Sequence, residues 1–256
     1  MADPKDDLLG PDEPQPADVI NSAGRAPFLL LGDHAGTLIP RRLGSLGLPP
    51  EERARHIAVD IGVRGLGERL AERLDAPFLH QRYSRLVVDC NRDPASPEAI
   101  PEVSDGTVIP GNQRLGARDR EQRVGAIHRP YHDRIASEIA ARPRAMLISL
   151  HSFTPVFGGY ARPWYVGVLH WEGDTRFARA LLDVLGEGPG RVVGDNEPYR
   201  MDATDYTVPR HAFAAGLPYA EIEVRQDLIA DADGQAAWAE ILAEAFGRAL
   251  LLHPSP

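Results

Sequence analysis

Short apolar runs that end in a polar residue or a glycine recur along the chain from Pro27 onward. A continuous apolar run of four to eight residues is typical of a strand that is buried on both faces. The runs predict five such strands, at residues 28–31, 85–89, 145–150, 164–169 and 220–224.

Between these runs, apolar residues recur every three or four positions, which is the spacing of one helix face. This spacing predicts helices at residues 63–74, 124–139, 177–185 and 238–246. Pro130 lies inside the second segment, where a proline predicts a kink or a break. Strands that alternate with helices favour the α/β class, here a three-layer sandwich around a mostly parallel mixed sheet.

Two further segments stand apart from this pattern. Residues 1–25 are rich in proline and aspartate and predict a disordered tail, because such a stretch buries too little apolar area to offset its ordering entropy. Residues 93–111 are rich in proline and glycine and predict a long surface loop. Residues 26–256 are expected to form a single domain, since one α/β domain often spans about 200–250 residues.

Composition excludes several chemistries. The single cysteine cannot form an internal disulfide or a multi-cysteine zinc site, and the only lysine, Lys5, lies in the predicted tail. The net charge of −9 argues against a general nucleic-acid binder. No apolar run reaches the roughly 18 residues of a membrane span. Without a targeting pattern the expected compartment is the cytoplasm, and the oligomeric state stays open.

Polar side chains gather where the predicted strands end. His34 follows the first strand and His151 the central one, while Glu221, Glu223 and Arg225 alternate along the last. In open α/β sheets ligands bind at the carboxyl ends of the strands. Two imidazoles and a carboxylate are the usual ligands of a catalytic zinc ion, so the two histidines become candidate ligands.

The carboxylates of the last strand allow two interpretations. A glutamate beside a catalytic zinc ion is the expected general base, a role that Glu223 or Glu221 could fill. An internal ion pair of either glutamate with Arg225 is equally compatible with the pattern. His128 and His132 are four residues apart, but Pro130 lies between them, so a surface position or an outer layer around the metal is favoured over direct ligation.

Asn91 and Arg92 follow the strand predicted at residues 85–89. A planar guanidinium binds a carboxylate through two hydrogen bonds, and a neighbouring amide can add a third. The pair therefore predicts a clamp for a substrate carboxylate, although an internal ion pair of Arg92 with Asp93 or Asp89 remains the alternative.

Taken together, these motifs resemble the N-formylglutamate amidohydrolase family, which is similar to zinc carboxypeptidases and aspartoacylases. The resemblance runs from Pro27 to about Ile229. It is carried by the segments DHAG at 33–36, HIAVDIG at 56–62, YSRLVVDCNR at 83–92, YH at 131–132, HSFTP at 151–155, NEPY at 196–199 and EVRQDLI at 223–229.

The resemblance implies a zinc-carboxypeptidase-like fold, Zn²⁺ or another divalent cation, and hydrolysis of an amide beside a carboxylate. It implies His34 and His151 as ligands, Asn91 and Arg92 as the clamp, and Glu223 as the catalytic glutamate. Arg85 and Arg225 are candidates for further contacts with a small carboxylate-bearing substrate.

One position departs from the pattern of the zinc carboxypeptidases. Thr37 stands where those enzymes place a glutamate ligand, so a third ligand must come from elsewhere. Asp60 is the first candidate and Asp33 the second. N-formyl-L-glutamate is the leading substrate, and another N-acyl amino acid or a peptidoglycan fragment is the alternative. The departure at Thr37 also leaves room for a binding protein that has lost catalysis.

Overall fold

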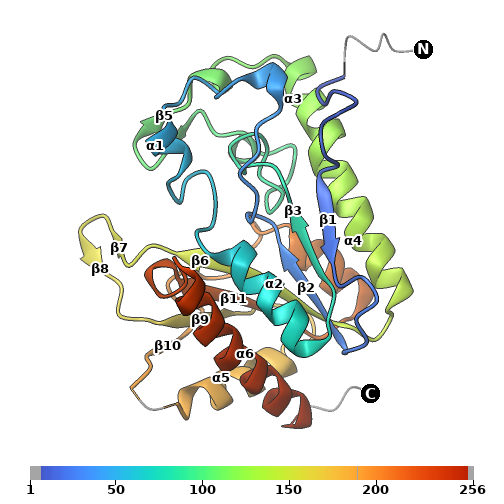
Figure 1. The fold of residues 1–256 in the computed structure, drawn as a ribbon, viewed down its shortest axis with the longest axis vertical. Helices are drawn as coiled ribbons and strands as arrows, with labels where there is room; N and C mark the ends of the chain where they lie inside the picture. Colours follow the sequence, from blue (N-terminus) through green and yellow to red (C-terminus); the bar gives the residue numbers. More distant parts are fainter. Residues whose placement is uncertain (1–6, 189, 253–256) are drawn as a thin grey trace.

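A seven-stranded sheet forms the middle layer of the molecule in the computed structural model, which describes residues 7–188 and 190–252 (Figure 1). The strand order is β1-β3-β2-β6-β11-β9-β10. Strands β3, β2, β6 and β11 run parallel, while β1, β9 and β10 run the opposite way. The strands are β1 Ala17–Ile20, β2 Phe28–Gly32, β3 Phe78–Gln81, β6 Met146–Phe153, β9 Val166–Leu169, β10 Val193–Asp195 and β11 Tyr219–Arg225.

Helices cover both faces of the sheet. One face carries α2 (Val63–Leu74), α5 (Arg176–Gly186) and α6 (Ala232–Leu252). The other carries α3 (Ala117–Arg123) and α4 (Arg129–Ala141), together with long loops. The smaller elements are α1 Pro50–Arg53 and the hairpins β4–β5 (Val103–Ser104, Thr107–Val108) and β7–β8 (Val156–Phe157, Tyr160–Ala161).

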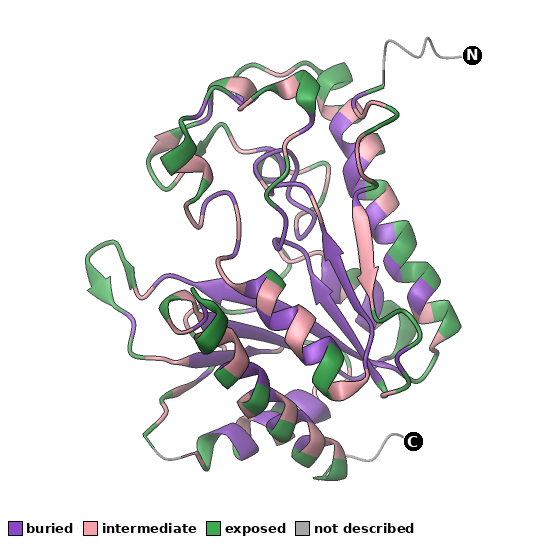
Figure 2. Ribbon diagram, viewed as in Figure 1, coloured by how far each residue is buried: buried purple, intermediate pink, exposed green. Residues whose placement is uncertain are grey.

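The alternation of side chains along the strands divides the core in two. On β2, Leu30 packs with α2 and α6, whereas Leu29 and Leu31 pack with α4 on the opposite face. On β6, Ile148 and Leu147 divide in the same way. Figure 2 shows the central strands buried along their length. The predicted three-layer α/β sandwich with a mostly parallel mixed sheet is confirmed.

Four of the five predicted strands are present, but the strand predicted at residues 85–89 is wrong. The segment is buried and apolar, yet it forms turns, because the Ser84 hydroxyl and carbonyl bond the amides of Leu86 and Val87. The strand that leads into this region is β3, which ends at Gln81, four residues before the start of the predicted strand. Burial alone therefore did not distinguish a strand from a packed loop.

The prediction of a disordered tail over residues 1–25 also needs correction. Its last part forms β1, which pairs antiparallel with β3 and so obtains backbone hydrogen bonds that its composition did not reveal. The Tyr83 hydroxyl donates to the Pro14 carbonyl at 2.8 Å, and Leu8 is buried. Residues 1–6 lie outside the described part of the chain.

Pro130 is accommodated without ending the helical path. The turn before it, Val124–His128, is a π-helix that joins α3 to α4, and Pro130 falls in the first turn of α4. Proline has no N–H to donate to the carbonyl of the preceding turn. The wider π-turn moves that carbonyl away from the proline ring, so the helix continues in the same direction. Within residues 7–188 and 190–252, none of the helices combines the length and the apolar character that crossing a bilayer requires.

Candidate active site

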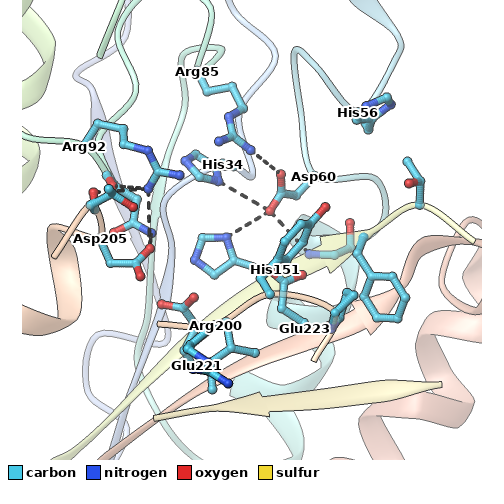
Figure 3. A pocket seen from close by; sticks show the side chains of 18 of the residues that line it. His34, His56, Asp60, Arg85, Arg92, His151, Arg200, Asp205, Glu221 and Glu223 are labelled. Carbon is cyan, nitrogen blue, oxygen red and sulfur yellow. Dashed lines mark hydrogen bonds and ion pairs between the residues drawn. The ribbon is translucent and has the colours of Figure 1, made fainter. Parts of the chain in front are cut away.

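The carboxyl ends of β2, β6 and β11 open onto a cavity of about 550 Å³ (Figure 3). His34 follows β2, His151 lies on β6, and Glu221 and Glu223 lie on β11. Because β2, β6 and β11 are parallel neighbours, their ends meet at one rim. Loops complete the cavity and add the two clamp residues, Asn91 and Arg92.

Three buried side chains converge at the base of this cavity: His34, Asp60 and His151, the ligand cluster. One ligand atom from each lies within 4.8 Å of the other two. Asp60 Oδ2 is 3.0 Å from His151 Nδ1 and 3.5 Å from His34 Nδ1. Asp60 comes from the loop before α2, and its amide bonds the His34 carbonyl at 3.0 Å. The structure thus places Asp60 beside both predicted histidine ligands.

An outer layer of polar groups orients the two imidazoles. His34 Nε2 lies 2.7 Å from Asp89 Oδ1, and because a carboxylate only accepts, Nε2 carries the proton of this bond and Nδ1 faces the cavity side. His151 Nε2 lies 3.0 Å from Ser149 Oγ and 3.7 Å from Asp33 Oδ2. A carboxylate behind the outer nitrogen of a histidine is the usual support of a metal ligand.

The ligand cluster fits a divalent cation. His34 Nδ1 is buried and has no hydrogen-bond partner, although it faces a carboxylate oxygen. Two nitrogens and one oxygen form a donor set that suits Zn²⁺ and leaves a position for substrate. The second candidate, Asp33, lies behind the cluster, where its Oδ1 accepts a 2.6 Å hydrogen bond from the Tyr131 hydroxyl.

Two carboxyl groups of β11 enter the cavity from one face of the strand. Glu223 and Glu221 pair in register with His151 and Ser149 of β6. In each glutamate, Oε2 is buried and has no hydrogen-bond partner. Burial raises the pKa of Glu223 to about 7, although the nearby His151 acts in the opposite direction. Burial likewise raises the pKa of Glu221 to about 8. A carboxyl with a pKa near neutrality is suited to both accepting and donating a proton.

Asn91 and Arg92 lie on the opposite wall of the cavity. The Asn91 amide oxygen accepts from the backbone amides of Tyr206 and Thr207, at 3.0 and 2.9 Å. Its nitrogen therefore faces Asp205, at 3.3 Å. Arg92 Nη1 lies 3.4 Å from the same Asp205 carboxylate and Arg92 Nε lies 3.5 Å from Glu98, so its partners differ from Asp93 and Asp89, the two considered from the sequence. Both residues still line the cavity, with the Arg92 side chain one-quarter exposed.

The two other predicted arginines differ in position. Arg85 lines the cavity, but its guanidinium bonds Asp89 at 2.7 Å and Asp60 at 3.2 Å, so it neutralises one carboxylate of the ligand cluster and one behind it. Arg225 pairs with Asp227 at 2.8 Å, stacks over Tyr165 and is not among the described residues that line the cavity. Two residues along a strand is about 6.6 Å, which takes Arg225 past the rim.

Several lining residues were not assigned a role from the sequence. The sequence left two interpretations of Glu221 open, a catalytic role and an ion pair with Arg225. No ion pair between Glu221 and Arg225 exists among the described residues. Asp205, Arg200 and Tyr199 come from the loop after β10, and His56 comes from the loop after α1. For the loop after β10, the NEPY segment at 196–199 was the only sequence signal, because irregular loops carry no periodic pattern.

Comparison with known proteins shows the family and the fold to which this chain is similar. The sequence model of the N-formylglutamate amidohydrolase family matches residues 26–230. The gene product Atu2144 of Agrobacterium tumefaciens has 38% identity and a TM-score of 0.91, with 96% of this chain and 98% of that chain covered. N-formylglutamate amidohydrolase from Ralstonia eutropha JMP134 has the same fold at 18% identity and a TM-score of 0.62, with 91% and 96% covered.

No curated protein sequence matches the chain. The family match spans most of the described sheet and contains the end of β2, the clamp loop, the end of β6 and β11, all of which line the cavity. The chain therefore belongs to the N-formylglutamate amidohydrolase family.

Proposed function

We propose that the protein hydrolyses the amide bond of an N-acyl amino acid, with N-formyl-L-glutamate as the leading substrate and formate and glutamate as products. One observation carries the proposal: the unpartnered carboxyl of Glu223 shares a cavity with the ligand cluster and with a cavity-lining arginine, Arg92. A base, a cation site and a carboxylate clamp are the parts that this hydrolysis needs.

His34, Asp60 and His151 would hold Zn²⁺ or another divalent cation. Such a cation, when bound, polarises an amide carbonyl and makes water more acidic. The observation that supports it is His34 Nδ1, which is buried, has no hydrogen-bond partner and faces the Asp60 carboxylate at 3.5 Å. Asp89 binds the opposite nitrogen of that ring as a donor, so Nδ1 is the nitrogen left to bind a cation.

The protein side chains divide the remaining work. Arg92, assisted by the Asn91 amide nitrogen, binds the substrate carboxylate and so orients the scissile bond. Glu223 removes a proton from the attacking water, whose oxygen forms the new bond to the acyl carbon. Glu223 then delivers that proton to the nitrogen as the C–N bond breaks, and the amine leaves neutral. A pKa of about 7 suits both transfers.

A different N-acyl amino acid is the second candidate, and the carboxylates of Asp202 and Asp205 are the observation that favours it. Both line the cavity, so one region of the lining is acidic. An ionised glutamate side chain would be repelled there, whereas a neutral or cationic side chain would not.

Steady-state assays on purified protein test the proposal. N-formyl-L-glutamate should be hydrolysed, activity should disappear after chelation, and added Zn²⁺ should restore it. A panel of N-formyl amino acids, N-acetyl-L-glutamate and a muramoyl peptide separates the candidates. Absence of turnover on every member, with full cation occupancy, would contradict the proposed hydrolysis and favour a binding protein.

A further inference from the structure

Three buried histidines lie behind the clamp, outside the described residues that line the cavity: His128, His132 and His211, the imidazole cluster. His132 and His211 are stacked, with ring centroids 5.2 Å apart and planes at 16°. His128 lies 4.5 Å from His132, and the Tyr206 ring contacts both. The rings come from the π-turn before α4, from α4, and from a π-turn at Pro209–Phe213.

The hydrogen bonds of this cluster end on the clamp backbone. His132 Nε2 lies 2.9 Å from the Cys90 carbonyl, and His128 Nε2 lies 3.1 Å from the Arg92 carbonyl. These two carbonyls flank Asn91, so the imidazoles hold the backbone on both sides of the clamp. A carbonyl only accepts, and therefore both Nε2 atoms carry protons.

The third ring completes a neutral chain of donors and acceptors. Burial lowers the pKa of His132 to about 3 and that of His211 to about 4, so both rings are neutral at pH 7. With its proton on Nε2, His132 offers the lone pair of Nδ1 to His211 Nε2, which lies 2.9 Å away. His211 thus fixes the tautomer of His132 through one donated hydrogen bond.

The same region holds the Asn91 side chain. Tyr206, whose ring packs on the imidazole cluster, donates its backbone amide to Asn91 Oδ1. The imidazoles therefore hold the backbone of the clamp, and the backbone amide of Tyr206, a residue that packs on them, holds the Asn91 side chain. A merely space-filling core would need no donors aimed at Cys90 and Arg92.

We propose that His128, His132 and His211 are positioning residues for the Asn91–Arg92 clamp, and that they set the affinity for the substrate carboxylate without touching substrate. This inference rests on the proposed function, since it requires that the clamp bind a carboxylate. Displacing a bidentate donor by even one ångström weakens the contact that it makes.

We assign to the clamp the α-carboxylate, which every N-acyl amino acid carries, so the test compares N-formyl-L-glutamate with its α-amide, which lacks that group. His132→Phe keeps a ring of similar size and removes both hydrogen bonds. We expect it to raise KM for the carboxylate about tenfold, the value of one or two hydrogen bonds, and to change turnover of the α-amide less than about twofold. His132→Gln retains a donor near Nε2 and should recover most of the loss.

Controls separate positioning from general damage. His80→Phe removes a buried imidazole of β3 that does not contact the clamp, and it should leave the preference for the carboxylate unchanged. His128→Phe removes the bond to Arg92 O and should repeat the effect of His132→Phe. It decides the question if the His132 variant does not fold. In an Arg92→Ala background, His132→Phe should add no further loss of preference.

The outcomes are distinguishable. Equal losses on both substrates, or an unchanged preference in the variants at positions 132 and 128, would overturn the positioning role alone. Wild-type protein that turns over neither substrate would instead contradict the proposed function. A selective loss on the carboxylate, with unchanged cation content, supports the inference.

Discussion

The two walls of the cavity are held in place by different means. On one wall, His151 and Glu223 are neighbours on adjacent parallel strands, and the sheet ladder fixes their separation. On the other, Asn91 and Arg92 lie in a loop and depend on side chains that bond their backbone. The first wall carries the proposed chemistry and the second the proposed substrate contacts. Rigid elements thus hold the reacting groups, while a supported loop sets binding.

The largest difference between the two walls should appear in Glu223→Gln, a variant of the wall held by the sheet. Loss of the general base should lower kcat about 10²–10⁴-fold, while cation content measured by elemental analysis stays unchanged. Glu221→Gln is the matched variant, two residues earlier on the same strand and similarly buried. It should lose much less activity; a larger loss there would exchange the roles of the two carboxyls.

Asp89→Asn tests the layer that orients the ligand cluster. An amide can present its NH₂ group to His34 Nε2 and so favours the wrong tautomer, which should weaken cation affinity roughly 10–100-fold. Competition with a chelating dye measures the affinity. Asp93→Asn, on the exposed turn of the same loop, is the control. Equal affinities in the two variants would show that Asp89 does not support a ligand.

Arg92→Lys addresses the wall formed by loops. A lysine keeps the charge but loses the planar fork, so KM for the carboxylate substrate should rise about tenfold with little change in kcat. Arg225→Lys serves as the control, because Arg225 pairs with Asp227 outside the described cavity lining. A rise in KM for Arg225→Lys would return that residue to the binding site.

The imidazole cluster should also make the stability of the fold depend on pH. His132 and His211 are neutral when folded, with pKa values lowered to about 3 and about 4, whereas the unfolded chain takes up protons near pH 6.5. The unfolded state therefore binds more protons below that pH, and stability should fall as pH drops from about 6.5 towards 4. Urea unfolding at several pH values, compared with His132→Gln, isolates this contribution. An equal pH slope in both proteins would contradict it.

Much of the architecture was readable from local pattern. The apolar runs at 28–31, 145–150, 164–169 and 220–224 each became a strand, and α2 spans the residues predicted for it, 63–74. Both patterns arise from burial of one local segment, which needs no knowledge of its neighbours. β1 was missed for the opposite reason: four half-buried residues became a strand only because the edge of β3 was available.

The site followed the same division. His34 and His151 were predicted as ligands because parallel strands bring their carboxyl ends to one edge, whereas Glu223 was preferred to Glu221 through the family resemblance. Arg225 was misplaced because alternation gives the face of a strand but not where the rim ends. The proposed role of His211 could not be read from the sequence, since its partner His132 is distant in the chain and the two meet only where α4 contacts the π-turn at Pro209–Phe213.

The sequence by itself determined the fold class, the family resemblance and the residue types available for chemistry. Because the chain has one cysteine and one lysine, the side chains expected to carry the chemistry were histidine, carboxylate and arginine. Only the tertiary structure brought Asp60 to within 3.0 Å of His151 and aimed two imidazoles at the clamp carbonyls. Periodicity reports how a segment meets the core, whereas contacts between loops depend on distances that no local pattern encodes.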